Sequence, residues 1–499
     1  MLAPEEAAGA ARIKRITISD FRAFPAIQPA IINVGGCHLL AYGENGAGKS
    51  SIYRALRGLF STRSEEILPL HNVFTDPPQP SVKVLMTDGT EFKWDSAGHP
   101  SAQVLPIARR ATFLSHTRLT EMSTGATANE PPNLFSVAVE RLLADFEVTV
   151  EGGGKRFVGE LWANVQRALN ARVTRAGRQQ RPQYFIRDLT AALDAFNAAM
   201  REAIGRLEAE AQGILRRLLN ALTPDALTLV GLTFYDLSWD GDGKEIRNRS
   251  LIPIVRFRDY TPPALQSFLN EGRLSALAMA IYFAARLISV PPNDRALKLL
   301  VLDDLLISLD YSHRRPVLDV LADLFKGWQI ILLTHDRFWF ELAREQLLDK
   351  PWKAIEIHED VDNDGLLRPL VRESENDLVK ATLAQARSFL QEHHAAAAAN
   401  YARAACELTL RRYCRAHRAK FPYTDEPRKI SLEDLRGAGE QIAKDAPDCQ
   451  AAFAGILALQ KFVLNPLSHN PAEPVIEADV RAAIDAVALL ATECSKHKP

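Results

Sequence analysis

The chain has 499 residues, of which 47% are apolar and 24% are charged. This is the balance of a folded globular protein of about three structural units, and it excludes a disordered chain, a collagen-like chain and a disulfide-dense scaffold. Lysine and arginine number 60 against 61 acidic residues, so net charge indicates no partner and any affinity for nucleic acid must come from a local patch.

The cysteines and the apolar runs indicate the compartment. Five cysteines are scattered without a Cys-x-x-Cys pair, which suits reduced thiols in a cytosol and argues against a zinc site. Residues 1–10 lack the apolar core of a signal peptide. The longest apolar run, 274–290, contains Arg286 and is too short to cross a bilayer. We expect a cytoplasmic protein with no membrane partner.

Strand and helix patterns alternate along the chain. In order, they predict strands at 13–18 and 38–42, a helix from Ser50, strands across 80–114, a helical stretch at 133–222, strands at 227–257, an α/β pattern at 298–335, a hairpin at 352–372 and helices alone from 373 onward. Apolar residues at helical spacing predict an amphipathic helix over 189–222, about 50 Å long if continuous. These changes of pattern predict four segments, 1–132, 133–225, 226–373 and 374–499.

The strongest functional signal is a phosphate-binding motif, Gly43-Glu-Asn-Gly-Ala-Gly-Lys49-Ser50. It follows a predicted strand and precedes a predicted helix, the context that makes G-x-x-x-x-G-K-[ST] meaningful. Its glycines let backbone N–H groups surround phosphate oxygens at a helix N-terminus. Lys49 would reach the β- and γ-phosphates of ATP, and Ser50 would ligate Mg²⁺. The nucleotide-binding residues expected in this loop are Gly43, Asn45, Gly46, Gly48, Lys49, Ser50 and Ser51.

Two later strands end in polar residues suited to the same chemistry. The run 298–304 is an apolar strand that ends in Asp303 and Asp304, and the run 330–336 is another that ends in His335. Asp303 would lie beside the phosphate loop and hold the Mg²⁺, and Asp304 would orient and polarise the attacking water.

In this order of motifs, the chain resembles the ABC-type ATPases of the SMC/RecF class over roughly residues 11–372. Phe21-Arg22 resembles the element near the nucleotide, 269–273 the signature motif, 308–310 the aspartate loop, and His335 the switch histidine. The resemblance implies an α/β fold, a two-lobed ABC-type P-loop ATPase head with a helical insertion, followed here by an all-α C-terminal domain. It also implies ATP and Mg²⁺ as cofactors and nucleic acid, DNA or RNA, as a partner.

The resemblance further implies a homodimer, or a higher homo-oligomer, joined through its ATP sites. In the family, the signature of a second subunit caps the γ-phosphate, which here gives that role to Asn270, Glu271, Gly272 and, from the aspartate loop, Asp310. The chain departs from the family in three ways. Asn270 replaces a serine, Asp304 replaces the catalytic glutamate, and no Mg²⁺-sensing glutamine is evident near 113–116. We expect slow hydrolysis, with ATP acting mainly as a dimerising switch.

The predicted insertion carries a basic stretch with aromatic neighbours. Tyr184 and Phe185 lie at its end, and such a segment can contact phosphates and stack on bases. A solvated helix face or a mobile loop is the alternative, and both interpretations stay open. The arginines of this stretch are Arg167, Arg172, Arg175, Arg178, Arg181 and Arg187.

The C-terminal helices carry a second candidate site. Arg403 and Glu407 share a helix face, and His469 follows in a helix end or loop. Together they resemble the Arg-x-x-x-Glu…His set of PrrC/RloC-type anticodon nucleases with HEPN-like helical domains, which implies RNA cleavage by acid–base chemistry. A competing match is Arg412-x-x-x-x-His417, and a structural ion pair with a capping histidine is the alternative.

Two functions follow from these patterns. In the first, an SMC/RecF-like ATPase acts with nucleic acid in bacterial anti-phage defence, and ATP-driven dimerisation gates its own C-terminal ribonuclease. In the second, a RecF-like ATPase of DNA repair or defence has no nuclease and signals through an effector protein.

Overall fold

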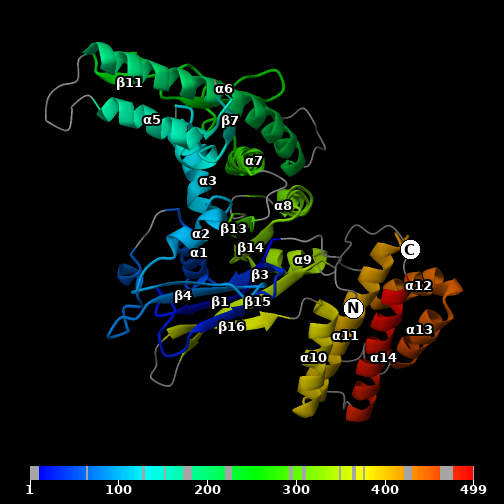
Figure 1. Cartoon of the computed structure of the whole chain (residues 1–499). Coiled ribbons are helices and arrows are strands. Elements are labelled where there is room, and N and C mark those ends of the chain that lie inside the picture. Colours follow the sequence, from blue (N-terminus) through cyan, green and yellow to red (C-terminus); the bar gives the residue numbers. More distant parts are fainter. Residues whose placement is uncertain are drawn as a thin grey trace. The chain divides into compact units, whose positions relative to one another are not determined.

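The computed structural model describes residues 10–62, 66–125, 130–150, 153–171, 182–219, 227–290, 296–305, 309, 311–347, 350–361, 367–374, 377–420, 430–460, 463 and 476–497. The chain forms two compact units. The first comprises Met1–Ala343 and Ile355–Arg372, and the second comprises Arg344–Ala354 and Glu373–Pro499. Figure 1 labels their helices and strands.

The first unit begins with an antiparallel sheet of order β2-β1-β4-β5. Its strands are β1 (Ile13–Ser19), β2 (Ala30–Asn33), β4 (Ser81–Met86) and β5 (Glu91–Asp95). Alternate residues of β4 are buried, as the alternating sequence predicts for a sheet with one face on the core. A buried glutamine, Gln329, fixes the start of β1 because it accepts from the Ile13 N–H and donates to the Ile13 carbonyl.

A second, six-stranded sheet has the order β16-β15-β3-β14-β13-β6. Its strands are β3 (His38–Gly43), β6 (Thr112–Ser115), β13 (Leu299–Asp303), β14 (Gln329–Thr334), β15 (Trp352–Val361) and β16 (Leu367–Ser374). The pairs β3–β14, β14–β13 and β13–β6 are parallel, and every residue of β13 and β14 is buried, as expected for strands covered on both faces. The carboxyl ends of β3, β14, β13 and β6 therefore meet at one edge.

Short helices complete this lobe. They are α1 (Lys49–Leu59), the 3₁₀ helix Leu68–Leu70, α2 (Ser101–Ala108) and α3 (His116–Ser123). The sequence patterns over 80–114 indicated strands and missed α2. Its buried residues, Val104, Ile107 and Ala108, have helical spacing, so the signal was present but is only two turns long.

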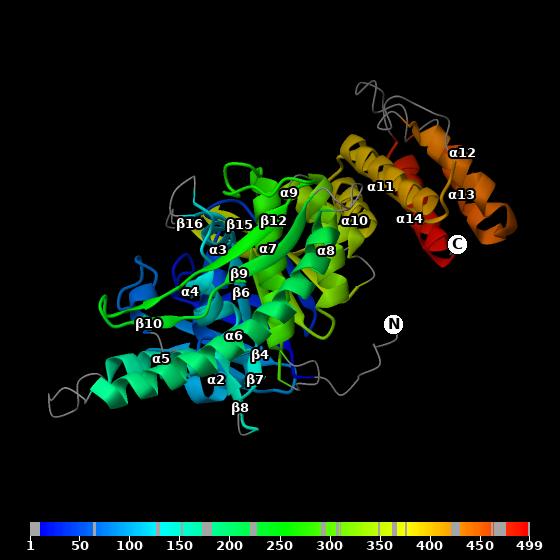
Figure 2. The same cartoon turned by 90° about the horizontal axis from the view of Figure 1, so that it is seen from above.

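The predicted helical insertion contains two helices that lie side by side, α5 (Val158–Asn170) and α6 (Pro182–Leu218) (Figures 1 and 2). With 37 residues, α6 is about 55 Å long. Small elements flank the pair: α4 (Phe135–Val137), the π-helical turn Ala138–Leu142, β7 (Glu147–Thr149), β8 (Lys155–Phe157), β9 (Thr228–Phe234), β10 (Ser238–Asp240), β11 (Glu245–Arg247) and β12 (Leu251–Arg256).

Three further helices belong to the C-terminal part of the head, α7 (Glu271–Ser289), α8 (Tyr311–Leu324) and α9 (Arg337–Gln346). Among the described residues, α7 is the one helix long and apolar enough to cross a membrane, but 78% of it is buried within the protein. Arg286 within it donates to Thr112 Oγ1 and to the Arg109 carbonyl. The length and apolar composition of α7 are therefore explained by its packing in the core of the first unit.

The second unit is built mainly from helices: α10 (Leu378–Gln391), α11 (Ala395–Ala416), α12 (Leu432–Ile442), the 3₁₀ helix Ala443–Asp445, α13 (Pro447–Leu459) and α14 (Glu477–Lys496). Asp377 caps α10 and Ser431 caps α12 through their side chains. The fold predicted from the sequence, an α/β head with a helical insertion and a helical C-terminal domain, is confirmed.

Candidate nucleotide and metal site

The loop between β3 and α1 forms a cradle that only glycine can build. Gly46 and Gly48 have φ angles of 95° and 99°, a region that favours glycine. A Cβ on Gly46 would lie 2.7 Å from Glu359 Oε1, and one on Gly48 would lie 3.0 Å from Pro369 Cγ. The loop ends at the N-terminus of α1, whose first N–H groups have no partner within the helix. This arrangement is a ready anion site.

Lys49 lies folded back onto this loop. Its Nζ donates to the carbonyl oxygens of Gly43 at 2.7 Å and Glu44 at 2.9 Å. Burial lowers the pKa of the ammonium, while the nearby Asp304 and Asp303 carboxylates offset part of that shift. The positive charge of Lys49 is therefore held at the loop by two neutral carbonyl oxygens, and phosphate oxygens can take their place as hydrogen-bond acceptors.

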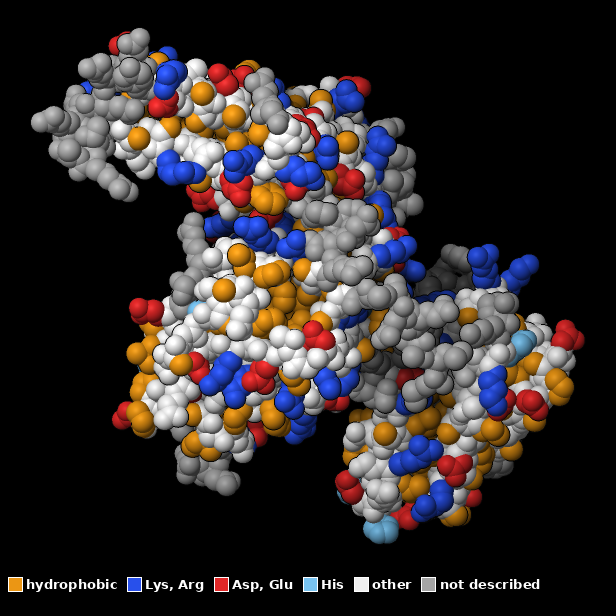
Figure 3. Space-filling model, viewed as in Figure 1, with side chains coloured by type: hydrophobic (Ala, Val, Ile, Leu, Met, Phe, Trp, Pro, Cys, Tyr) orange, Lys and Arg blue, Asp and Glu red, His pale blue; other side chains and the backbone are white. Residues whose placement is uncertain are grey.

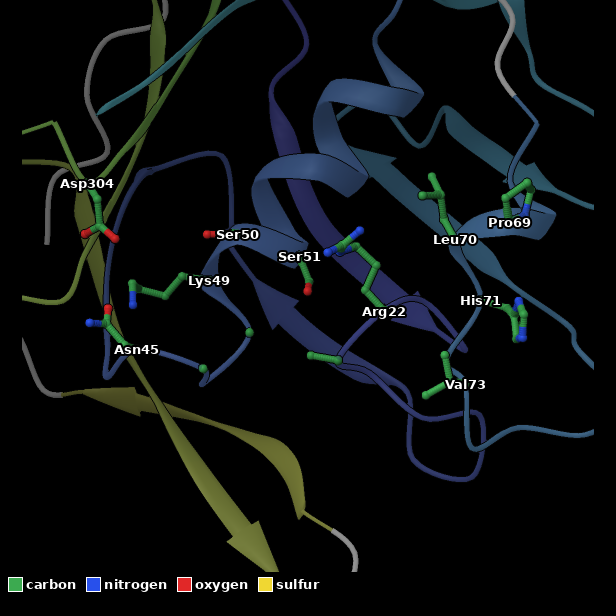
Figure 4. Close-up of a pocket in the computed structure, with 13 residues that line it drawn as sticks. Arg22, Asn45, Lys49, Ser50, Ser51, Pro69, Leu70, His71, Val73 and Asp304 are labelled. Atoms are coloured by element: carbon green, nitrogen blue, oxygen red, sulfur yellow. The ribbon is translucent and has the colours of Figure 1, made fainter. Parts of the chain in front are cut away.

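A cavity of about 480 Å³ opens on this cradle. Figure 4 shows Asn45, Lys49 and Asp304 at one end of it and His71 at the other. Of the nucleotide-binding residues predicted from the sequence, the lining includes Arg22, Asn45, Gly46, Gly48, Lys49, Ser50 and Ser51. The volume is of the size expected for a small-molecule site.

The sequence did not predict one wall of this cavity, which consists of Pro69, Leu70, His71 and Val73. The buried Asp20 holds this segment because its carboxylate accepts from the Asn72 N–H at 3.0 Å. The Arg22 N–H donates to the Leu70 carbonyl at 2.9 Å. These contacts join segments that are distant in the sequence, and no periodic pattern in residues 68–73 indicates them.

Ser50 and Asp303, the two residues predicted to hold Mg²⁺, lie together in the structure. Ser50 Oγ donates to Asp303 Oδ2 at 3.2 Å, while Asp303 Oδ1 is buried and has no hydrogen-bond partner among the described residues. Burial, together with repulsion from Asp304, raises the pKa of Asp303 to about 6. A buried carboxylate oxygen without a donor, beside a serine hydroxyl, fits a hard divalent cation such as Mg²⁺.

Asp304 follows in a strained backbone conformation, with φ 51°. Its Oδ1 accepts from the His335 N–H at 2.9 Å and from the His335 Nδ1 at 2.8 Å. The structure thus places Asp304, which was predicted to orient the attacking water, in contact with His335, which was predicted to be the switch histidine. Arg314 of α8 braces the same region, since it donates to the Leu309 carbonyl and pairs with Asp336.

The signature residues lie elsewhere in the first unit. Asn270 is the N-cap of α7, where its side chain accepts from the Arg273 N–H at 3.0 Å. Asn270 and Glu271 are exposed, and neither they nor Gly272 lines the described cavity. Asp310 lies outside the described residues.

The predicted C-terminal set is described only in part. Arg403 Nε and Glu407 Oε1 lie 3.0 Å apart, with side chains 23% and 33% exposed, while His469 lies outside the described residues. Each residue of the competing pair has another partner: Arg412 pairs with Asp377 at 2.6 Å, and His417 stacks on the ring of His497.

A neighbouring cluster in the second unit was missed by sequence reasoning. Arg436 is 8% exposed, donates to Gln460 Oε1 at 2.8 Å and pairs with Glu440. The i, i+4 spacing of Arg436 and Glu440 was the available signal.

In the insertion, one of the two aromatic residues near the basic stretch, Phe185, packs against another ring of the protein. Phe185 is 6% exposed and packs edge-on against Trp239 at 5.6 Å, so its ring is covered within the protein and does not offer an open face for a base. Arg187 pairs with Asp188. On the face seen in Figure 3, acidic side chains alternate with basic ones over the long helix. The segment 172–181, with four of the arginines, lies outside the described residues.

Together these features define a P-loop nucleotide site on a two-lobed α/β head. No protein-family model matches the chain, and no curated protein matches it in sequence.

Many solved structures are similar to this chain, among them the following three. The recombination mediator protein RecF, in its RecF-ATPrS structure, is 12% identical with a TM-score of 0.42, covering 72% of this chain and 99% of that one. An Smc head domain with an extended coiled coil from Pyrococcus furiosus, bound to the C-terminal domain of ScpA, is 13% identical with a TM-score of 0.39, covering 77% and 99%. The SMC head domain from Thermotoga maritima is 14% identical with a TM-score of 0.32, covering 73% and 99%.

These proteins are the ones that the motifs of the sequence resemble. This likeness concerns the fold alone. The chemistry of the site is argued from the residues described above.

Proposed function

We propose that the protein binds Mg²⁺-ATP in the cavity at the start of α1 and hydrolyses it. The observation that carries this proposal is the buried Asp303 Oδ1, which has no donor among the described residues and stands beside Ser50 at the phosphate loop. An uncompensated buried carboxylate is costly. A cation bound there removes that cost.

Each residue has a defined task in this proposal. The loop N–H groups and Lys49 hold the phosphates, and Ser50 and Asp303 hold the metal. Mg²⁺, when bound, neutralises phosphate charge. Asp304 accepts a proton from the attacking water, and His335, hydrogen-bonded to that carboxylate, keeps it oriented.

We further propose that two copies close over the nucleotide. Asn270, Glu271 and Gly272 stand at the N-terminus of a 19-residue helix, where unpaired N–H groups favour an anion. Asn270 and Glu271 are exposed and do not line the chain's own cavity, which supports a role toward a second copy. Asp310 of that copy would complete the cap.

For the second unit, we favour a ribonuclease gated by this dimerisation and acting in anti-phage defence with nucleic acid as partner. Arg403 and Glu407 support it because they form a partly buried pair, with His469 as the third residue. The alternative is an ATPase without a nuclease, whose helical unit docks an effector protein. RNA cleavage separates the two.

ATP turnover by the purified full chain tests the ATPase proposal. Wild-type protein should release phosphate from ATP only with Mg²⁺, and Lys49→Ala should weaken ATP binding by about tenfold or more, the loss of a charge-assisted contact. Lys14→Ala, at an exposed residue of β1, is the matched control. Equal ATP binding by wild type and Lys49→Ala would refute the site.

A further inference from the structure

A second cavity, of about 430 Å³, adjoins the nucleotide cavity. Ser50 and Leu70 line both cavities, and Asp303 lines only the second. Its walls come from α1, the end of β6 and the start of α3. Of its lining residues, only Ser50 and Asp303 have a role predicted from the sequence, as ligands of Mg²⁺.

Three arginines give the second cavity its charge, Arg54 and Arg57 from α1 and Arg118 from α3. Arg118 is partly buried and is fixed by a hydrogen bond to the Phe113 carbonyl at 3.0 Å. Arg54 makes no hydrogen bond or ion pair within the part of the chain that the structure describes. The Arg54 guanidinium therefore keeps donors that no described neighbour accepts.

The two carboxylates of the cavity do not balance this charge. Glu121 lies 3.5 Å from Arg141, outside the cavity lining. Asp303 is the carboxylate proposed to hold the metal. With a divalent cation on Asp303, the cavity is strongly positive, and guanidinium groups recognise phosphate oxygens in particular.

A buried hydroxyl also lines this cavity. Tyr53 is 4% exposed, and although its hydroxyl lies near that of Ser115, the two do not meet with hydrogen-bond geometry, which leaves the tyrosine hydroxyl without a partner among the described residues. Burial raises the pKa of this phenol to about 12, so it remains a donor. Tyr53 thus adds a neutral residue with an unpaired hydroxyl to the arginines that line this cavity.

We propose that this second cavity is a binding site for orthophosphate, which it receives from the nucleotide cavity after ATP hydrolysis. The shared Ser50 wall favours this source, because an anion leaving the metal passes directly into the field of the arginines. Arg118 contacts the phosphate, and Arg54 and Arg57 neutralise it from the exposed face of α1. The same donors suit a terminal phosphate of a nucleic-acid strand, which the experiment distinguishes.

The proposal rests on the proposed ATPase, so the test begins with ADP binding. Full-length protein is saturated with ADP and Mg²⁺ to fill the first cavity, and inorganic phosphate is titrated by calorimetry. Phosphate should bind, and Arg118→Gln should weaken it by about tenfold, the value of one charge-assisted hydrogen bond. Arg118→Lys should restore part of the affinity. Arg54→Gln, on an exposed residue, gives a second variant that leaves the core intact, and Arg15→Gln on β1 is the control.

The outcomes are distinct. Failure to bind ADP contradicts the nucleotide site itself. If ADP binds and phosphate does not, the second site is overturned. It is also overturned if phosphate binds to the Arg118 and Arg54 variants as tightly as to the wild-type protein. In parallel, a 5′-phosphorylated oligonucleotide is compared with the 5′-hydroxyl form. Arg118-dependent preference for the phosphorylated strand, without binding of free phosphate, overturns orthophosphate as the ligand.

Discussion

A single oxygen of Asp304 accepts two hydrogen bonds from His335, one from the backbone N–H at 2.9 Å and one from the ring at 2.8 Å. The residue is held in a left-handed backbone conformation, φ 51°, which costs free energy unless its surroundings impose it. The histidine therefore fixes both the position of the carboxylate and the end of β13. Loss of the carboxylate charge and loss of the histidine should have different effects.

Asp304→Asn should abolish ATP hydrolysis and preserve ATP binding. The amide cannot accept a proton, so turnover should fall by about 100-fold or more, while the backbone N–H of His335 still finds an oxygen. Because nucleotide is no longer consumed, the variant should elute as an ATP-dependent dimer in size-exclusion chromatography. Asp194→Asn, on the exposed face of α6, is the control, and unchanged turnover in Asp304→Asn would remove Asp304 from its role.

The stability of the metal-free protein should depend on the ionisation of Asp303. Its pKa is raised from 3.8 to about 6, so the stability that its protonated form contributes is present below 3.8 and is lost as the pH rises to about 6. The loss is on the order of 2 to 3 kcal/mol. Mg²⁺ should restore stability above this range, where the carboxylate is ionised.

Thermal unfolding with and without Mg²⁺ at about pH 5 and about pH 7.5 measures this dependence. We expect a Mg²⁺-induced rise in Tm at the higher pH alone. In Asp303→Asn, the Mg²⁺ effect should disappear and the metal-free protein should gain stability, whereas Asp259→Asn, at an exposed turn, should behave like wild type. An equal Mg²⁺ effect in both variants would place the metal elsewhere.

Arg403→Ala should abolish RNA cleavage or toxicity and leave ATP turnover intact. The Arg403–Glu407 pair is partly exposed, so its removal should cost only about 0.5 kcal/mol of stability, and a loss of activity cannot be ascribed to unfolding. Arg411→Ala, on the exposed face of the same helix, is the matched control, with His469→Ala run beside it. Wild-type cleavage by both site variants would favour the effector-docking alternative.

Two glycines in helices should respond in opposite directions to alanine. A Cβ on Gly58 of α1 would overlap the ring of the buried Trp94, so Gly58→Ala should destabilise the first unit by about 1 to 3 kcal/mol. Gly205 of α6 has open space around its Cα, and Gly205→Ala should stabilise by up to about 1 kcal/mol. Chemical denaturation measures both, and destabilisation by Gly205→Ala would contradict the described packing of α6.

The phosphate loop could be predicted from sequence because its chemistry is local. Eight consecutive residues specify the turn, and the left-handed angles of Gly46 and Gly48 are what glycine at those positions indicates. Asp303 and Asp304 could be predicted because the apolar run before them marks a buried parallel strand. The adjacency of Ser50 and Asp303 then follows from the meeting of strand ends at one sheet edge.

The far wall of the cavity and the second cavity could not be predicted in the same way. His71 and Val73 reach the first cavity through contacts that Asp20 and Arg22 make from distant sequence. Arg118 approaches Ser50 only because β6 lies beside β13. Side-chain placement across separate elements leaves no periodic trace in the sequence.

Arg314 connects two segments that lie apart in the sequence, one at Leu309 and the other at Asp336. Through its guanidinium, the carbonyl of Leu309, just before α8, is tied to Asp336, next to the histidine that orients Asp304. If the proposed second copy docks near Leu309, a displacement of the backbone there would reach the segment that carries His335 through this one side chain. In the dimer proposed above, Arg314 would therefore serve as a mechanical link between the docking copy and Asp304.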